Sequence, residues 1–180
     1  MASCKKPGSG KSVCDGKDEE FSEGYYNICC LSNEGDVQGH FLKIEDNQVT
    51  ANASRHDEKA ILKIRAVQNE KDELVMIIEN KSNEALSVEH DELNDKYQIC
   101  VRSSEELEKI HKLRDAEHYK NNYLFKKVPR KPGSEIFQIT SNAAIDGKPL
   151  TVAFDEYGKP MDPTQNHQED GSFFRLTSIN

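Results

Sequence analysis

Short apolar runs separated by turn-forming residues make up most of this chain. Several runs alternate between apolar and polar positions, as in residues 61–66, where odd-numbered positions would face one way and even-numbered positions the other. This alternation is typical of half-buried β-strands and predicts an all-β fold. The predicted strands occupy residues 25–31, 40–44, 48–51, 60–67, 74–79, 85–89, 97–101, 122–128, 134–140, 149–154 and 172–178.

The residues between these runs have the chemistry of tight turns, and one segment has the signals of a helix. Pairs such as Asp46-Asn47 and Asp146-Gly147 favour the left-handed backbone that hairpin turns require. A helix is predicted from Ser103, which forms a capping box with Glu106 and is followed by apolar residues at helical spacing, Leu107, Ile110 and Leu113.

An internal similarity suggests how the strands are arranged. The segment "ALSVEHDE" (85–92) matches "PLTVAFDE" (149–156) at most positions, and "FLKIEDNQ" (41–48) is a weaker third copy. Three units near residues 21–67, 72–103 and 122–180 would then carry about four strands each. We therefore predict a β-trefoil of three four-stranded units with one short helix inserted between units two and three. A β-sandwich is the alternative.

Length, composition and charge set limits on the organisation and on the partners. The chain has 180 residues, of which 35% are hydrophobic, enough for one domain. We expect a flexible tail over residues 1–20 and a single, monomeric domain over 21–180. The net charge of −8 argues against a nucleic-acid partner. Without a long apolar run or an apolar signal region, we expect no membrane insertion and synthesis in the cytoplasm.

Motifs for catalysis, metals or cofactors are weak. Gly10-Lys11-Ser12 resembles the end of a phosphate-binding loop, but Lys5 stands where the first glycine should be. The five cysteines lack the close-spaced pairs of a zinc site, and no Gly-x-Ser-x-Gly elbow occurs outside the tail. We therefore expect no catalytic, metal or cofactor-binding residues and no enzymatic activity.

The last third of the chain resembles the C-terminal part of interleukin-1 family cytokines. The resemblance is carried by Leu124–Lys127, by Phe137 with Ser141, by the apolar strand Leu150–Phe154 and by Phe174–Leu176. It implies a secreted ligand, released without a signal peptide, that binds immunoglobulin-like receptors of the interleukin-1 receptor family and promotes receptor pairing.

Other ligands and inhibitors with the same predicted fold stay open as alternatives. Fibroblast growth factors share the trefoil, but residues 155–171 are acidic here, so heparin is an improbable partner. A trefoil protease inhibitor, with 155–171 as its reactive loop, or an intracellular scaffold is the alternative from another class.

Charged residues supply the candidate contacts with a receptor ectodomain. An acidic group and a basic group are expected to meet the receptor, and the resemblance implies processing after an acidic residue of the tail. The candidate acidic contacts are Glu89, Asp91, Glu92, Glu105 and Glu106; the basic contacts are Lys126, Lys127, Arg130 and Lys131; the candidate processing site is Asp15.

Overall fold

The computed structural model describes residues 22–33, 40–105 and 122–179, which form eleven β-strands and three short 3₁₀ helices. Each of the eleven predicted strand segments overlaps one of these strands, with shifted ends in most cases, so the all-β prediction is confirmed. The strands are β1 (Gly24–Cys30), β2 (Phe41–Glu45), β3 (Gln48–Ala53), β4 (Leu62–Gln68), β5 (Leu74–Glu79), β6 (Glu84–Asp91), β7 (Lys96–Ser103), β8 (Phe125–Pro129), β9 (Phe137–Ile145), β10 (Lys148–Thr151) and β11 (Phe174–Ser178). The 3₁₀ helices are η2 (Leu31–Asn33), η3 (Glu58–Ala60) and η6 (Asp170–Ser172).

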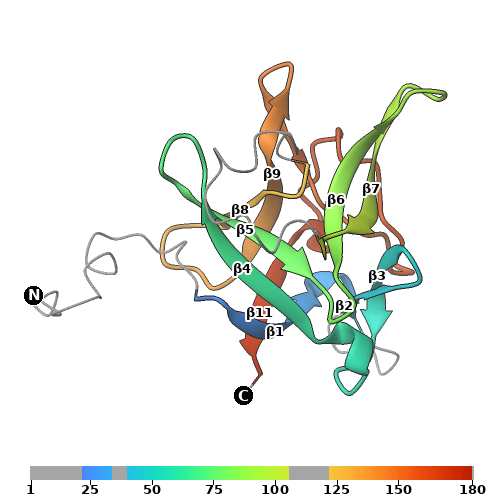
Figure 1. Cartoon of the computed structure of the whole chain (residues 1–180), viewed down its shortest axis with the longest axis vertical. Helices are drawn as coiled ribbons and strands as arrows, with labels where there is room; N and C mark the ends of the chain where they lie inside the picture. Colours follow the sequence, from blue (N-terminus) through green and yellow to red (C-terminus); the bar gives the residue numbers. More distant parts are fainter. Residues whose placement is uncertain (1–21, 34–39, 106–121, 180) are drawn as a thin grey trace, which may run out of the picture.

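Six of the strands close into an antiparallel barrel (Figure 1). Strand β1 pairs with β4 and continues through β5, β8, β9 and β11 back to β1. The closing ladder joins the first and last strands of the described chain, with Ile28 opposite Leu176. Closure leaves these six strands paired on both sides.

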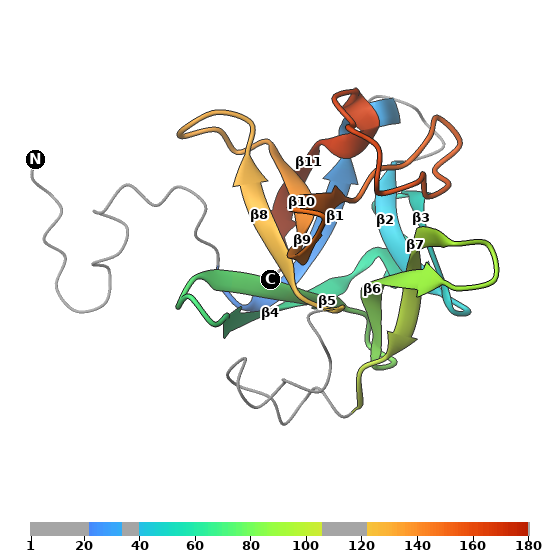
Figure 2. The same cartoon turned by 90° about the horizontal axis from the view of Figure 1, so that it is seen from above.

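The remaining five strands extend this barrel. The β2–β3 hairpin pairs with β1, the β6–β7 hairpin pairs with β5, and β10 pairs with β9. The two hairpins lie side by side in both views, in contact through β3 with β7 and β2 with β6 (Figures 1 and 2). In Figure 1 the tip of the β6–β7 hairpin extends away from the barrel at the upper right.

The prediction of a β-trefoil with an inserted helix is wrong. The strands form one closed six-stranded barrel with five further strands, and the described residues contain no α-helix. The two matching segments also fold differently. Residues 85–92 lie in β6 and its turn, paired with β7 along the whole strand, whereas 149–156 leave β10 after a register shift and continue as a loop.

The predicted helix cannot begin as expected at Ser103. Ser103 is the last residue of β7, paired with Glu84, and the backbone N–H of Ser104 then donates to the carbonyl of Asn83. The pairing with β6 holds this backbone extended, which competes with a helical start. The rest of the predicted helix, from Glu106 onward, lies outside the described residues.

The barrel interior holds the main hydrophobic core. Its largest fully buried side chains include Phe125, Phe137 and Phe174 from three of the barrel strands. Each such side chain contributes roughly 1.5–3 kcal/mol through removal from water. The apolar run of β5 is buried on both faces, because Met76 and Ile78 belong to the interior core while Val75 and Ile77 belong to a second cluster with Tyr123 and Leu124.

Two hairpin turns follow the turn chemistry of the sequence. Asp46 and Asn47 have φ angles of 53° and 61° between β2 and β3, and Asp146 and Gly147 have 52° and 79° between β9 and β10. Consecutive left-handed residues give the two-residue turn whose twist matches that of paired strands. These two predicted turns are confirmed.

Candidate functional site: an acidic pocket

The long connection between β10 and β11 is held against the barrel at several points. Its first turn is closed by Asp155, whose carboxylate accepts from the backbone N–H groups of Tyr157 and Lys159 at 2.8 and 2.9 Å. Gly158 then packs on β3, where its carbonyl accepts from the N–H of Ala51 at 2.9 Å. The connection is therefore an anchored surface and not a protruding arm.

The end of the same connection folds back over its beginning. The N–H of Phe154 donates to the carbonyl of Gly171 at 2.9 Å, and the Phe154 ring meets that of Phe174 edge-on at 6.1 Å. Gly171 is required here because an added Cβ would lie 2.0 Å from the carbonyl oxygen of Phe154. This contact brings residues 153–156 and 167–172 to opposite sides of one hollow.

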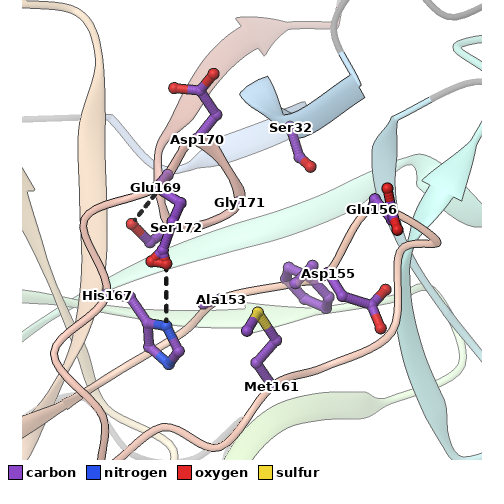
Figure 3. A pocket seen from close by; sticks show the side chains of 11 residues that line it. Ser32, Ala153, Asp155, Glu156, Met161, His167, Glu169, Asp170, Gly171 and Ser172 are labelled. Carbon is purple, nitrogen blue, oxygen red and sulfur yellow. Dashed lines mark hydrogen bonds and ion pairs between the residues drawn. The ribbon is translucent and has the colours of Figure 1, made fainter.

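That hollow is a pocket of about 430 Å³ with an apolar floor and an acidic rim (Figure 3). The apolar part comes from Ala153, Phe154 and Met161. The other lining residues are Ser32, Asp155, Glu156, His167, Glu169, Asp170, Gly171 and Ser172. Four of the lining residues are carboxylates and none is lysine or arginine, so the pocket favours positively charged groups.

His167 is the most constrained polar side chain of the pocket. It is only 3% exposed, and its Nε2 lies 2.6 Å from the backbone carbonyl oxygen of Asp162. Because a carbonyl oxygen can only accept, Nε2 carries the proton in this bond. In the neutral imidazole Nδ1 is then a lone-pair acceptor.

The Nδ1 atom of His167 faces the carboxylate of Glu169, with 3.9 Å between Nδ1 and Oε1 (Figure 3). The distance is too long for a direct hydrogen bond, and both atoms are acceptors when the imidazole is neutral. A protonated imidazole, or a donor placed between the two atoms, would satisfy both.

Polar neighbours fix the geometry around His167. Gln138 from β9 donates to the His167 carbonyl at 3.0 Å and to the hydroxyl of Ser172 at 3.1 Å. Ser172 in turn donates to the carbonyl of Glu169 at 2.9 Å. At Asp162, hydrogen bonds from the Thr164 side chain and backbone lower the pKa of the carboxyl. Asp162 therefore remains charged beside the histidine at neutral pH.

One basic side chain reaches the pocket rim from outside. The Nη2 of Arg130 lies 3.9 Å from Oδ1 of Asp170, and its guanidinium lies over the Phe173 ring at 4.1 Å. This is one of the predicted basic contacts. It already shows how a guanidinium can sit between an aromatic face and a carboxylate of this rim.

The other predicted basic residues do not form one patch with Arg130. Lys126 pairs with Glu73 at 3.3 Å, while Lys127, the next residue on β8, points elsewhere and lies 5.2 Å above the Phe137 ring. Successive residues of a strand face opposite sides, so the cluster in sequence is divided in space. Lys131 is exposed in the turn after β8.

The predicted acidic contacts lie mainly on the β6–β7 hairpin. Glu89 is bound by Arg102 across the hairpin, with Nη1 at 2.9 and 2.8 Å from its two oxygens. Asp91 accepts from the Asn94 side chain at 2.7 Å and from the Leu93 N–H, and these bonds, Asn94 first, lower the pKa of Asp91. Glu92 is exposed at the tip and Glu105 follows β7. The structure does not bring them to the pocket.

Two predicted residues, Glu106 and Asp15, lie outside the described residues.

The sequence analysis did not predict that His167 and Glu169 lie together. In the sequence His167 is one of six scattered histidines. The available signal was its place two residues before Glu169 in an acidic loop, but the partner carbonyl of Asp162 is visible only once the loop path is known.

Within the described residues, no cluster of three or more histidine, cysteine, aspartate or glutamate side chains is arranged to hold a metal ion. No helix in the same part of the chain is long and apolar enough to cross a membrane.

Comparisons with known proteins support the fold alone. No protein-family model matches the chain, and no curated protein matches it in sequence. Among solved structures, the chain is similar to part of a mosquitocidal holotoxin, with a TM-score of 0.58 and 11% sequence identity over 88% of this chain. The match spans 17% of the holotoxin chain. At this identity the likeness shows a shared fold and nothing about activity.

The expectation of a trefoil cytokine of the interleukin-1 family is corrected by these results. It relied on strand motifs and on three repeated units, whereas the strands form a closed barrel, and no comparison supports that family. Motifs such as Leu124–Lys127 describe single strands, and single strands of similar pattern occur in many folds. The family assignment is therefore not carried forward.

Proposed function

We propose that this chain is a protein ligand that acts by binding, and that its partners are ectodomains built from immunoglobulin-like domains. One observation carries the proposal: the anchored connection between β10 and β11 holds an acidic pocket, and Tyr157, which follows the lining residue Glu156 in the chain, is 69% exposed. Exposed tyrosines next to a pocket are typical anchors of protein interfaces. The acidic rim would speed encounter with a basic partner surface.

A second exposed apolar side chain supports contact with two partners. Leu93, at the tip of the β6–β7 hairpin, is 95% exposed and belongs to a different element from the pocket. Two such features on one closed barrel suit a ligand that engages one receptor and then recruits another. In this proposal the ligand acts outside the cell and binds neither heparin nor nucleic acid.

The arrangement around His167 favours binding over catalysis. A serine nucleophile would need to give its proton to the imidazole, but the Ser172 hydroxyl donates to the Glu169 carbonyl. The loop is also a poor protease inhibitor, because Gly158, Pro163 and His167 are buried against the barrel and leave little extended backbone for a protease cleft. We therefore include the absence of enzymatic activity in the proposal.

Surface plasmon resonance of the full chain over a panel of immunoglobulin-like ectodomains tests this proposal. The panel includes interleukin-1-receptor-family and fibroblast-growth-factor-receptor ectodomains, and immobilised heparin serves as a polyanion control. We expect saturable binding to at least one ectodomain and none to heparin at physiological salt. The absence of binding to every ectodomain would overturn the proposal.

A further inference from the structure

We propose that the chain cleaves its own peptide bond between Asp162 and Pro163, with the Asp162 carboxylate as nucleophile and His167 stabilising the oxyanion. The inference goes beyond the proposed function and does not depend on a receptor. The sequence contains a single Asp-Pro pair, and it is this one. Met161, the residue before the pair, and His167 line the same pocket (Figure 3).

The carbonyl oxygen of this peptide bond is held by a buried side chain. His167 is only 3% exposed, and its Nε2 donates to the Asp162 carbonyl oxygen at 2.6 Å. The backbone N–H of Gln165 points to the same oxygen at a longer 3.5 Å. Donors fixed on a carbonyl oxygen stabilise the negative charge that this oxygen gains when a nucleophile adds to the carbon. The loop therefore polarises one peptide bond before any reaction begins.

The nucleophile belongs to the same residue as the carbonyl carbon that it would attack. The Oδ1 atom of Asp162 accepts from the Thr164 N–H at 2.9 Å and from the Thr164 hydroxyl at 2.6 Å, which fixes the side chain in the turn. Because both bonds from Thr164 go to Oδ1, we assign Oδ2 as the attacking atom. A carboxylate acts as a nucleophile in its ionised form, and attack within one residue needs no encounter between two molecules.

The charged groups around the bond set the pH at which it should break. The Thr164 hydroxyl, then the Thr164 N–H, His167 and Lys96 of β7 lower the pKa of the Asp162 carboxyl. On its other side His167 faces the Glu169 carboxylate, 3.9 Å from Nδ1. Asp162 therefore stays ionised in acid that would protonate an ordinary aspartate, while acid supplies the proton that the leaving nitrogen needs. Cleavage should be observed in mild acid.

The reaction balances as the hydrolysis of one peptide bond. Oδ2 of Asp162 adds to the Asp162 carbonyl carbon, and the oxygen that becomes negative accepts from Nε2 of His167. The bond to the Pro163 nitrogen then breaks, this nitrogen takes a proton from the solvent, and Asp162 is left as a cyclic anhydride. Water opens the anhydride to two carboxyl groups. Proline suits the leaving role, because its nitrogen forms a tertiary amide and departs as a basic secondary amine.

Both sides of the bond are tied to the barrel independently. The N–H of Met161 donates to the Ala153 carbonyl at 2.8 Å, and the Pro163 carbonyl accepts from the N–H of Thr151 at 2.9 Å. On the far side of the bond, β11 is paired with β1. Cleavage would therefore leave two pieces held together in one fold. It occurs once per chain and turns over no other substrate, which is compatible with a ligand that acts by binding.

Incubation of the full chain in acid tests the inference without any receptor. The chain is kept at the lowest pH at which circular dichroism shows it folded, and at the same pH in urea, where the Asp-Pro pair persists without the bond to His167. Mass spectrometry under denaturing conditions measures the fragments 1–162 and 163–180. We expect the folded chain to be cleaved at least about tenfold faster than the unfolded chain. Equal rates, or no cleavage of the folded chain, would overturn the inference.

Two variants test the roles of the two side chains. His167→Phe removes the donor but keeps a flat ring, and we expect it to slow cleavage at least about tenfold, as for loss of an oxyanion donor. Asp162→Asn keeps the shape of an exposed side chain but removes the nucleophilic carboxylate, so it should abolish both fragments. Cleavage of Asp162→Asn at the wild-type rate would overturn the inference, whether or not His167→Phe folds.

Glu135→Gln is the matched control. It also removes one carboxylate, from an exposed position in the connection between β8 and β9. We expect its cleavage rate to stay within about twofold of wild type, because exposed charges away from the reacting atoms are screened. If Glu135→Gln slowed cleavage as much as Asp162→Asn, the effect would be one of overall charge and the assignment of Asp162 as nucleophile would be wrong.

Discussion

Gly171 is the residue at which the connection between β10 and β11 comes closest to the barrel wall. Its backbone passes so near Phe154 that a Cβ would lie 2.0 Å from the carbonyl oxygen of that residue. The obstacle is backbone, which cannot rotate away as a flexible side chain can. The close packing of residue 171 against Phe154, on which the shape of the pocket depends, is therefore possible only with glycine at this position.

Gly171→Ala should destabilise the protein by about 3 kcal/mol or more, because the loop must move to relieve the overlap. Gly133→Ala is the matched control: its φ of 81° is strained for alanine, but nothing lies within 4 Å of the added Cβ. We expect that control to cost roughly 1–2 kcal/mol. Urea unfolding measures both, and equal losses would contradict the close contact at Gly171.

Cys30 is a buried thiol whose sulfur lies 3.6 Å from the carbonyl oxygen of the pocket residue Gly171. Burial raises the pKa of this thiol from 9.0 to about 11. A group whose pKa is higher in the folded state keeps its proton on folding. Its contribution to stability is therefore complete below pH 9 and is lost as the pH rises from 9 toward 11.

We expect iodoacetamide at pH 8 to leave Cys30 unmodified in the folded protein and to modify it in urea, because the thiolate is both scarce and shielded. Peptide mapping by mass spectrometry reads this out. The Cys30→Ala variant should also lose part of the decline in unfolding free energy between pH 9 and pH 11. If iodoacetamide modified Cys30 in the folded protein as fast as in urea, the residue would be accessible and the prediction would be wrong.

At the scale of elements, the same asparagine turn occurs at both ends of β5. Asn69 follows β4 and Asn80 follows β5, and in each the side-chain oxygen accepts from the N–H groups two and four residues on. The residue three positions on, Asp72 or Asn83, has a φ near 60°. Each asparagine amide then donates to the glutamate at the end of its turn and to a distant residue.

Asn80→Ala should cost about 2 kcal/mol or more, because it removes two acceptor and two donor contacts, including the bond to the Ile44 carbonyl that ties this turn to β2. Asn52→Ala is the control, since Asn52 is exposed and its side-chain oxygen accepts from the Thr50 hydroxyl at the surface. It should lie within about 0.5 kcal/mol of wild type. Thermal and urea unfolding compare the two, and a neutral Asn80 variant would contradict the role given to this turn.

These turns show which parts of the fold can be predicted from the local sequence. Residues 80–83, which lie between two of the predicted strands, form a turn, because asparagine hydrogen-bonds its own neighbouring backbone whatever the rest of the fold does. The strand β10 shows the opposite. Its predicted extension to residue 154 ends at Thr151, where the N–H bonds to Pro163 of the returning loop. A local apolar pattern could not show that competing partner.

At the scale of the whole molecule, closure of the barrel was beyond local reasoning. The ladder that closes it pairs β1 with β11, from opposite ends of the described chain. Apolar alternation decides which face of each strand is buried, but the same alternation suits a trefoil, a sandwich or a barrel. Only the pairing of distant strands separates these folds.

The candidate site has the same dependence on distant contacts. The charged residues chosen from sequence were chosen as exposed clusters, and most prove to be paired within the chain, as Glu89 is with Arg102. His167 lies in the pocket only because the loop that carries it returns to the barrel at Gly171. The sequence did predict the acidic character of residues 155–171, and Asp155, Glu156, Glu169 and Asp170 of this segment line the pocket.

Formation of a complex with two receptor ectodomains tests the account most directly. The full chain is mixed with ectodomains singly and in pairs, and size-exclusion chromatography with light scattering reports the mass of each species. The account predicts a one-to-one complex with a first ectodomain and a larger complex, containing one copy of each component, when a second ectodomain is added. If the chain elutes alone in every mixture, it is not a ligand of these receptors, and the proposed function is wrong.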